Sequence, residues 1–296
     1  MFQGTLTAVI TPFTSKASGA GALSVDIPTY CDLLEWQLSL GIDGIVVCGT
    51  TGESVTLSAE EKKTLIAKTV EVVKGRVPVI AGTGSNSTAQ TIEATKEAKG
   101  LGVDGALIVS PYYNKPTQEG LFQHFSAVAK EGGLPVVLYN IPGRTAVEVL
   151  PATFAKLARI PGIVAVKQAV DSVVKLLELV DATDGKIALL AGDDPLVHAV
   201  FSVGGKGVIS ASAAAIPSEI LAITKAGLAG KLDEALVAQL KALPLINALF
   251  TETNPAPVKA VLKIIGRIQD DSVRLPLVQV REETRAMLTK LFKPAM

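Results

Sequence analysis

Short apolar runs rich in β-branched residues recur along this chain, and helix-sized segments of mixed polarity separate them. The apolar residues within each run are nearly continuous, which is typical of a parallel strand covered on both faces. Eight runs are therefore predicted to form strands, at residues 6–10, 44–47, 77–81, 105–109, 136–139, 163–167, 187–191 and 207–209.

The segments between the runs carry signals for helix N-termini. Ser58 precedes Glu60 and Glu61, and Thr117 precedes Glu119, as in helices capped by a hydroxyl and opened by acidic residues. Eight strand–helix units in succession favour a (β/α)8 barrel, also called a TIM barrel. A doubly wound parallel sheet is the alternative, but it more often shows a GxGxxG motif after its first strand, and none is present there.

Helical periodicity continues beyond the eighth run, over residues 217–250, 256–265 and 280–292. No stretch in this part is rich enough in Pro, Gly or Ser to indicate a flexible linker between separate domains. We therefore predict a barrel over residues 1–228 and a C-terminal helical extension over residues 229–296 that packs on the barrel.

Composition and charge narrow the class of partner. The chain has 296 residues, 48% of them hydrophobic, so it can bury a large core. It has 28 Lys and Arg against 28 Asp and Glu without a run of like charges, which disfavours nucleic acid or a membrane as a partner.

Residues 1–13 lack the basic start and apolar centre of a signal peptide. Cys31 and Cys48 read as buried small hydrophobic residues, which suits the reducing cytoplasm.

Polar residues that can do chemistry cluster just after several of the predicted strands. Active sites of TIM barrels lie at the carboxyl ends of the strands, so these residues are expected to meet at one mouth. The segments are GTTGES at 49–54, SPYYNKP at 110–116, YNIPGRT at 139–145 and AGDD at 191–194. Their concentration predicts an active site at that mouth.

Lys167 ends the apolar run 163–167, which would carry a charged amine into the interior. Burial disfavours the ammonium form and leaves a neutral, nucleophilic amine, which can form a Schiff base with a ketone. A strand-end lysine can also simply extend to water without a chemical role. The polar residues at the other strand ends favour the Schiff base.

Four residues at these strand ends could assist Lys167. Thr50 and Thr51, between two glycines, predict a turn whose amides and hydroxyls can hold a carboxylate, although an ordinary turn before a helix would look the same. Tyr139 could pass a proton, relayed by Thr50, or could be a packed ring. Arg144 follows Pro and Gly in an expected loop, where it could clamp a carboxylate or lie free in solvent.

Two other chemistries are disfavoured. Asp193 and Asp194 look like a metal-binding pair, but no His or Glu stands nearby at ligand spacing, so no metal is expected. His124 and His198 lie within helical patterns and have no evident triad partner, which disfavours hydrolysis by a serine and a histidine.

The ordered set of motifs resembles the dihydrodipicolinate synthase family, within the pyruvate-dependent class I aldolases. The resemblance runs essentially from end to end. It rests on TAVITPF (7–13), GTTGES (49–54), AGTG (81–84), PYYNKP (111–116), YNIPGRT (139–145), GGKGVIS (204–210), NPAPVK (254–259) and RLP (274–276). It implies a barrel that condenses pyruvate with L-aspartate 4-semialdehyde to 4-hydroxy-tetrahydrodipicolinate, in the diaminopimelate route to lysine.

The resemblance also implies catalytic roles. Lys167 would form the Schiff base with pyruvate, and no metal or organic cofactor would be needed because the lysine itself acts as the electron sink. The proton relay would consist of Thr50, Tyr139 and Tyr113. The residue that matches Tyr113 reaches across from a neighbouring subunit in this family, which implies a homodimer or, more usually, a homotetramer built as a dimer of dimers.

Further residues would bind the substrates, again by the resemblance. Thr51 would hold the carboxylate of pyruvate, and Arg144 would receive the carboxylate of aspartate semialdehyde. Gly192 and Ile209 match backbone positions that line the pocket. The expected partners are therefore the two small substrates and further copies of the chain.

Two departures from the family pattern stand out. Gln168 follows the lysine where most relatives carry an acid, and alternation along a strand should point it away from Lys167. Members that lysine inhibits hold its ammonium with a glutamate on the helix after AGTG, and they have histidines near the helix after GTTGES. The matching residues here are Gln90, Ala59 and Lys62. Loss of the carboxylate predicts insensitivity to lysine.

Two rival functions share part of this pattern. Aldolases for N-acetylneuraminate or for 2-keto-3-deoxy sugar acids would share Lys167, Tyr139 and the GTTGE-type turn. They generally lack the combination of Tyr-Tyr-Asn and Gly-Arg-Thr found here, so Arg144 is the discriminating residue. A noncatalytic barrel that serves as a scaffold is the second rival, and the intact lysine, tyrosines and threonines disfavour it.

Overall fold

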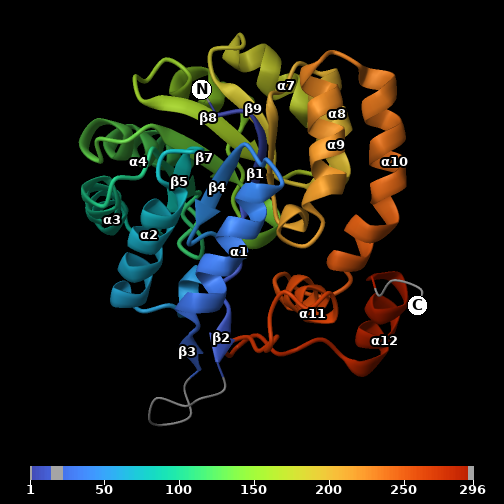
Figure 1. Cartoon of the computed structure of the whole chain (residues 1–296). Helices are drawn as coiled ribbons and strands as arrows, with labels where there is room; N and C mark the ends of the chain where they lie inside the picture. Colours follow the sequence, from blue (N-terminus) through green and yellow to red (C-terminus); the bar gives the residue numbers. More distant parts are fainter. Residues whose placement is uncertain (1, 15–22, 293–296) are drawn as a thin grey trace.

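The computed structural model describes residues 2–14 and 23–292 and confirms the predicted TIM barrel (Figure 1). Eight parallel strands close in the order β1-β10-β9-β8-β7-β6-β5-β4. They are β1 (Gly4–Ala8), β4 (Gly44–Val47), β5 (Val79–Gly82), β6 (Gly105–Val109), β7 (Val136–Asn140), β8 (Ile163–Gln168), β9 (Ala188–Ala191) and β10 (Gly207–Ser210). Because β1 pairs with both β10 and β4, the barrel has no open edge.

All eight predicted strands are present, with the bounds of β1 and β5 displaced by up to two residues. β1 begins earlier than predicted because Thr5 is buried in the strand although it is polar, and Thr7, within the predicted run, is buried as well. The hydroxyl of Thr5 shares a hydrogen bond with that of Thr224, and the hydroxyl of Thr7 donates to Gln37 Oε1. These polar side chains interrupt the apolar pattern without interrupting the strand.

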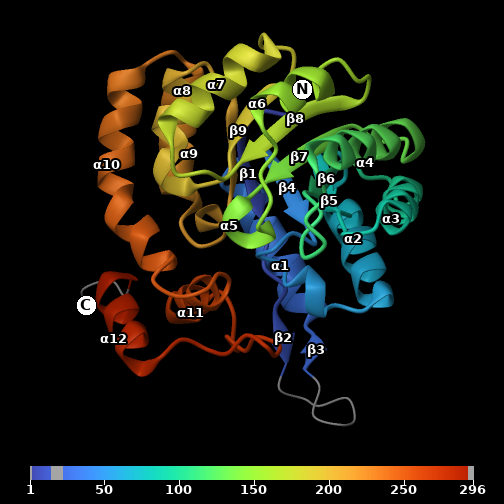
Figure 2. The ribbon, with the colours of Figure 1, turned by 180° about the vertical axis from the view of Figure 1, so that it is seen from behind.

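Helices follow the strands and cover the outside of the barrel (Figures 1 and 2). They are α1 (Ile27–Ser39), α2 (Ala59–Val73), α3 (Thr88–Gly100), α4 (Gln118–Glu131), α6 (Pro151–Leu157), α7 (Val173–Thr183), α8 (Val197–Ser202) and α9 (Pro217–Leu228). The predicted caps are present, because Ser58 and Glu61 form a reciprocal capping box at α2 and Thr117 accepts from Gly120 N at α4. Each cap fixes the point where a mouth segment enters its helix.

Three helices follow the barrel, namely α10 (Leu232–Leu249), α11 (Ala256–Ile264) and α12 (Glu282–Phe292). The single helical segment predicted over 217–250 is wrong, because the chain breaks between α9 and α10, where Gly230 adopts a left-handed φ of 73°. α10 packs against α9 and α8, and α11 packs against α12. The division at residue 228 stays a prediction.

Several short elements follow strands at their carboxyl ends. They are the two-stranded antiparallel sheet of β2 (Phe13–Thr14) and β3 (Ser24–Val25), the 3-10 turns η1 (Ser54–Thr56), η2 (Asp194–Leu196) and η3 (Ser212–Ala214), and the short helix α5 (Pro142–Thr145). In both views the segment between α11 and α12 passes beside β2 and β3 (Figures 1 and 2). C-terminal residues therefore reach the side of the barrel mouth.

Apolar side chains form two layers of core. One layer fills the inside of the barrel and includes Leu6, Val46 and Leu190, while the other lies between the strands and the helices. Tyr139 and Ala169, at the carboxyl ends of β7 and β8, belong to the inner layer. The packed interior therefore extends up to the mouth and forms the floor of the site.

The two cysteines differ in burial. Cys48 is buried as predicted, but the prediction is wrong for Cys31, which is only half-buried on α1. Across residues 2–14 and 23–292, no helix combines the length and the apolar character needed to cross a membrane.

Candidate active site

Lys167 and Tyr139 lie beside each other at the carboxyl ends of β8 and β7. The strand register pairs the two residues directly, so their side chains lie on the same face of the sheet. Lys167 Nζ lies 4.2 Å from the centroid of the Tyr139 ring, and both residues are buried. The structure thus brings together the amine and the phenol that were expected at one mouth.

The GTTGES segment forms the predicted tight turn between β4 and η1. Within it, Glu53 N donates to Thr50 O at 3.0 Å. Thr51 is buried, and its hydroxyl accepts a hydrogen bond from Asn254 Nδ2 at 3.0 Å. Thr50 is half-buried instead. The two neighbouring threonines therefore have different surroundings. Thr51 contacts the C-terminal segment, which we define as residues 254–274, and Thr50 faces open space.

The loop after β6 carries two tyrosines in different environments. Tyr112 is half-buried, whereas Tyr113 is 89% exposed. Tyr113 has a left-handed φ of 72°, which is uncommon for a residue with a side chain. Asn114 fastens the loop to its neighbour by donating to Asn86 O at 2.9 Å. Within one chain, Tyr113 thus faces solvent and not the buried Lys167.

Arg144 lies in the short helix α5 and not in the loop that was predicted. Pro142 occupies the first helical position, where its fixed φ suits a helix and its missing N–H costs no hydrogen bond. The guanidinium of Arg144 is exposed at the mouth. The backbone at Arg144 is therefore helical, contrary to the prediction, but the side chain remains accessible to a ligand.

A cavity of about 760 Å³ connects these elements. Its lining includes Thr50, Tyr139, Arg144 and Asn254 at the mouth, and it extends over α2 and α3 to Ala59, Lys62, Gln90 and Tyr112. Within the part of the chain that the structure describes, some predicted site residues lie outside this lining. They are Thr51, Tyr113, Lys167, Gly192 and Ile209. Tyr139 is therefore the residue that both borders the cavity and contacts Lys167.

The ends of β9 and β10 contribute two of the predicted backbone positions. Ile209 is fully buried in the inner layer of the core. Gly192 N donates to Gln168 O at 2.7 Å, and a Cβ at Gly192 would lie only 2.8 Å from the Cβ of Ala169. A larger residue would therefore displace the backbone just after the strand that carries Lys167.

The two acidic residues after β9 have different surroundings. Asp194 is buried and its Oδ2 accepts from Ser212 N at 2.9 Å, while burial raises the pKa of its carboxyl. Burial and the neighbouring Asp194 raise the pKa of Asp193. Across residues 2–14 and 23–292, no three His, Cys, Asp or Glu side chains gather as a metal site would require.

Gln168 points away from Lys167, as strand alternation predicts. Its Oε1 accepts from Asn140 Nδ2 at 3.0 Å, and Asn140 Oδ1 in turn accepts from Val149 N at 3.0 Å. Both side chains are buried. The neutral amide pair thus fastens β7 to β8 on the side opposite the amine.

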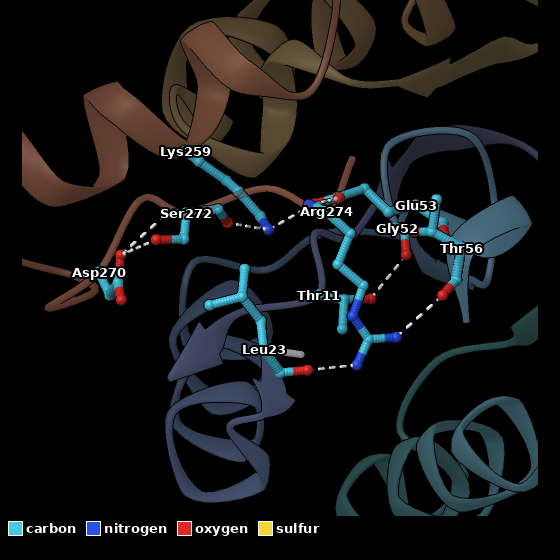
Figure 3. A network of polar contacts seen from close by, with 9 residues as sticks. All are labelled: Thr11, Leu23, Gly52, Glu53, Thr56, Lys259, Asp270, Ser272 and Arg274. Carbon is cyan, nitrogen blue, oxygen red and sulfur yellow. Dashed lines mark hydrogen bonds and ion pairs between the residues drawn. The ribbon is translucent and has the colours of Figure 1, made fainter. Parts of the chain in front are cut away.

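A network that sequence reasoning missed holds the GTTGES turn from the C-terminal side (Figure 3). Lys259 of α11 forms a buried ion pair with Glu53 and donates to Ser272 O at 2.9 Å. Burial lowers the pKa of Lys259 to about 8, although the Glu53 carboxylate favours the charged form. The Lys259 Nζ also lies 4.1 Å from the centroid of the Phe13 ring.

Arg274 adds a second set of bonds to the same turn (Figure 3). Its backbone N donates to Glu53 Oε2 at 2.9 Å, and its guanidinium donates to Thr56 O at 2.9 Å. The guanidinium also forms an ion pair with Glu61, which lowers the pKa of that carboxyl. The C-terminal segment therefore contacts the turn through both backbone and side-chain groups.

A family model described as the dihydrodipicolinate synthetase family matches residues 1–295. The chain belongs to this family. It is 48% identical over 293 residues to the 4-hydroxy-tetrahydrodipicolinate synthase of Geotalea uraniireducens (strain Rf4), a match that covers 99% of this chain and 98% of that one.

Solved structures of the family share the fold. A chloride-inhibited dihydrodipicolinate synthase from Acinetobacter baumannii, complexed with pyruvate, matches with a TM-score of 0.93 at 42% identity and covers 98% of this chain and 97% of that one. A protein described as the first monomeric dihydrodipicolinate synthase variant matches with a TM-score of 0.93 at 39% identity, over 98% of this chain and 95% of that one. The family resemblance predicted from the motifs is therefore confirmed over the whole length.

Proposed function

We propose that this protein condenses pyruvate with L-aspartate 4-semialdehyde to give 4-hydroxy-tetrahydrodipicolinate. Its membership of the synthase family supports the reaction, and so does the name of its relative from Geotalea uraniireducens. The observation that carries the proposal at the site is the buried Lys167 amine, 4.2 Å from the Tyr139 ring. Together they supply a nucleophile and a proton carrier at the barrel mouth.

The first step joins Lys167 to pyruvate. The amine attacks the ketone carbon, and loss of water from the resulting carbinolamine gives an imine. Removal of a proton from the methyl group of pyruvate then gives an enamine, which attacks the aldehyde carbon of the second substrate. The amino group of that substrate displaces Lys167 from the imine carbon and closes the ring. One water leaves overall, and the lysine is regenerated without a metal or an organic cofactor.

These steps need a carrier that takes and returns protons. We assign this relay to Tyr139, Thr50 and Tyr113. Tyr139 borders both the cavity and Lys167, and Thr50 borders the cavity. The exposure of Tyr113 supports an assignment in which it completes the site of a neighbouring copy. Each relay group would then hold a proton within hydrogen-bonding reach of the reacting atoms.

Two carboxylates must also be bound. We assign the carboxylate of pyruvate to Thr51 and that of aspartate semialdehyde to Arg144, whose guanidinium can form two parallel hydrogen bonds. Arg144 borders the cavity at the mouth, where the second substrate would enter. We assign pocket-lining backbone groups to Gly192, just after the neighbouring strand β9, and to Ile209, on the next strand β10.

We propose that the protein works as an assembly of copies, a homotetramer or a homodimer, in the cytoplasm. Val174 and Leu177 on α7 and Val237 and Leu240 on α10 are exposed apolar residues, which suits surfaces that meet another subunit. A relative described as the first monomeric variant also supports assembly as the ordinary state of this family.

Borohydride reduction tests the proposed nucleophile. In the presence of pyruvate it should fix a three-carbon carboxyethyl group on the peptide that contains Lys167, and Lys167→Arg, which keeps a long side chain but removes the amine, should abolish this label. A coupled assay with both substrates, which follows NADPH use by the next enzyme of lysine synthesis, tests the overall reaction. Labelling of another lysine, or turnover by Lys167→Arg, would falsify the mechanism.

A further inference from the structure

The C-terminal segment makes three separate attachments to the turn that carries Thr50 and Thr51. Asn254 bonds to Thr51. Lys259 pairs with Glu53, and Arg274 bonds to Glu53 and Thr56 (Figure 3). These partners lie about two hundred residues away from the turn along the chain, with separations of 203, 206 and 221. The position of the turn therefore depends on a part of the protein outside the barrel.

The ion pair between Lys259 and Glu53 is completely enclosed. Both side chains have 0% exposure. Taking two charges out of water costs about as much as their attraction returns, so such a pair is weak evidence for a gain in stability. Its geometric effect is direct, because Glu53 adopts a left-handed φ of 54° immediately after the two threonines and Gly52. A residue with a side chain holds that conformation only when its surroundings impose it.

Asn254 acts on the substrate-binding hydroxyl itself. Its Nδ2 donates to Thr51 Oγ1 at 3.0 Å, so the hydroxyl accepts that bond and its own proton is not used by Asn254. A hydroxyl has one proton to donate, and this one stays available for a carboxylate. Asn254 also borders the cavity. Its amide thus fixes both the place of Thr51 and the direction in which Thr51 can donate.

We propose that Asn254 and Lys259 are positioning residues for the reaction. They hold the turn at 50–53 so that Thr51 donates to the pyruvate carboxylate and Thr50 stays in reach of the reacting atoms. This inference rests on the proposed function. The reaction is sensitive to such placement, because an error of about 1 Å can cost roughly a hundredfold in rate.

The first test replaces the buried cation. Lys259→Met should raise KM for pyruvate and lower kcat, together by roughly tenfold to a hundredfold in kcat/KM. Saturating pyruvate with borohydride should still label Lys167, because the nucleophile is untouched. The double variant Glu53→Gln with Lys259→Met removes both charges, so it avoids an unpaired buried carboxylate and should show the same kinetic loss.

Lys263→Met is the matched control. Lys263 lies one turn further along α11 and pairs with Asp271, and neither residue contacts the turn. This variant removes an ion pair from the same segment, so its thermal midpoint should fall while kcat and KM stay near those of the wild type. Kinetic constants of the Lys259→Met and double variants that equal those of Lys263→Met would overturn the positioning role.

The second test reverses the hydrogen bond at Thr51. In Asn254→Asp the carboxylate can only accept, so it takes the Thr51 proton away from the substrate, and KM for pyruvate should rise roughly tenfold or more. Asn254→Ala removes the bond that places the hydroxyl but leaves the Thr51 proton available to the substrate, so it should have a smaller effect. An Asn254→Asp enzyme with an unchanged KM overturns the inference, even if the Lys259 variants do not fold. Absence of labelling and turnover in the wild type would instead reject the proposed function.

Discussion

The turn after β4 and the loop after β6 both carry hydroxyl groups of the proposed relay, but the chain holds them in different ways. The turn after β4 is largely buried, although Thr50 itself is half-buried, and Asn254, Lys259 and Arg274 hold the turn from the C-terminal side. The loop after β6 instead projects Tyr113, which is 89% exposed.

This difference bears on which parts of the proposed site a single chain would complete by itself. Every polar group that Glu53 offers is satisfied within the chain, so the turn has its final surroundings before any assembly. Tyr113 has a strained backbone and no enclosing contacts, which is a costly way to present a ring unless something else receives it. We infer that one relay hydroxyl is positioned by the fold and the other by a second copy.

The largest effect is expected at Tyr113. Tyr113→Phe removes the hydroxyl and should lower kcat by roughly a hundredfold to ten-thousandfold, the range for loss of a proton carrier. Tyr112→Phe is the matched control, since Tyr112 borders the far part of the cavity and has no proposed role in the relay. Steady-state kinetics on both variants measure the contrast.

Mixed assemblies sharpen this prediction. Co-expression of Tyr113→Phe with Lys167→Ala should restore activity, up to roughly a quarter of the wild type for random pairing, because one of the two sites in a mixed dimer would combine an intact lysine with an intact tyrosine. If Tyr113 serves its own chain, no mixture regains activity, and the proposed contrast between the two loops fails.

The strands and Lys167 could be predicted from the sequence because their signals are local. A strand buried on both faces gives a continuous apolar run, and a lysine that ends such a run is conspicuous. The network around Glu53 gives no local signal. Lys259 lies in a helical pattern, where a lysine ordinarily reaches solvent, and its partner is 206 residues away. Its apolar neighbours Val258 and Ala260 do not reveal its burial, because adjacent residues of a helix point to different faces.

His124 lies on α4, the helix that follows the loop with Tyr113, and it should make the stability of the protein depend on pH. It is buried, its Nδ1 shares a hydrogen bond of 2.9 Å with Thr88 Oγ1, and burial lowers its pKa from 6.5 to about 4. Between these values the unfolded chain binds a proton that the folded protein excludes, so stability should fall as pH drops from about 6.5 to about 4. The loss should be on the order of 2 to 3 kcal/mol.

Urea unfolding across this pH range measures the effect. His124→Leu should remove that part of the slope, and His198→Leu, at the other histidine of the chain, shows how much of any change follows from losing a histidine elsewhere. An unaltered slope in His124→Leu would mean that other groups, such as the buried carboxylates, cause the loss in acid.

Arg144 should give an intermediate kinetic effect. Its guanidinium is exposed at the mouth, so water screens it more than a buried clamp. Arg144→Ala should lower kcat/KM for aspartate semialdehyde by roughly tenfold to a hundredfold, while borohydride trapping of pyruvate changes little. Arg144→Lys should recover only part, because the fork geometry is lost. Arg159→Ala, at an exposed arginine that does not line the cavity, is the control. Unchanged kinetics would favour a sugar-acid aldolase.

The smallest effect is expected at Gln90, in the part of the cavity between the two contrasted segments. Gln90 Oε1 accepts from Ser85 Oγ at 3.1 Å, and Lys62 borders the same space. A free lysine would therefore meet an amide and a like charge where regulated relatives offer a carboxylate, and one charged hydrogen bond contributes roughly 1.5 to 3 kcal/mol. We expect no inhibition of the wild type by lysine at physiological concentrations.

Gln90→Glu restores the carboxylate but not the rest of the subsite, because Lys62 still repels the ligand and Ala59 offers it no polar group. Inhibition of this variant should be weak at most, and Gln90→Glu with Lys62→Gln should bind lysine more tightly than either single variant, since the repulsion is then gone. Glu93 lies about one helical turn from Gln90 on α3, so Glu93→Gln is the control. Inhibition of the wild type by submillimolar lysine would show that another acid, such as Glu97 on the cavity wall, supplies the contact.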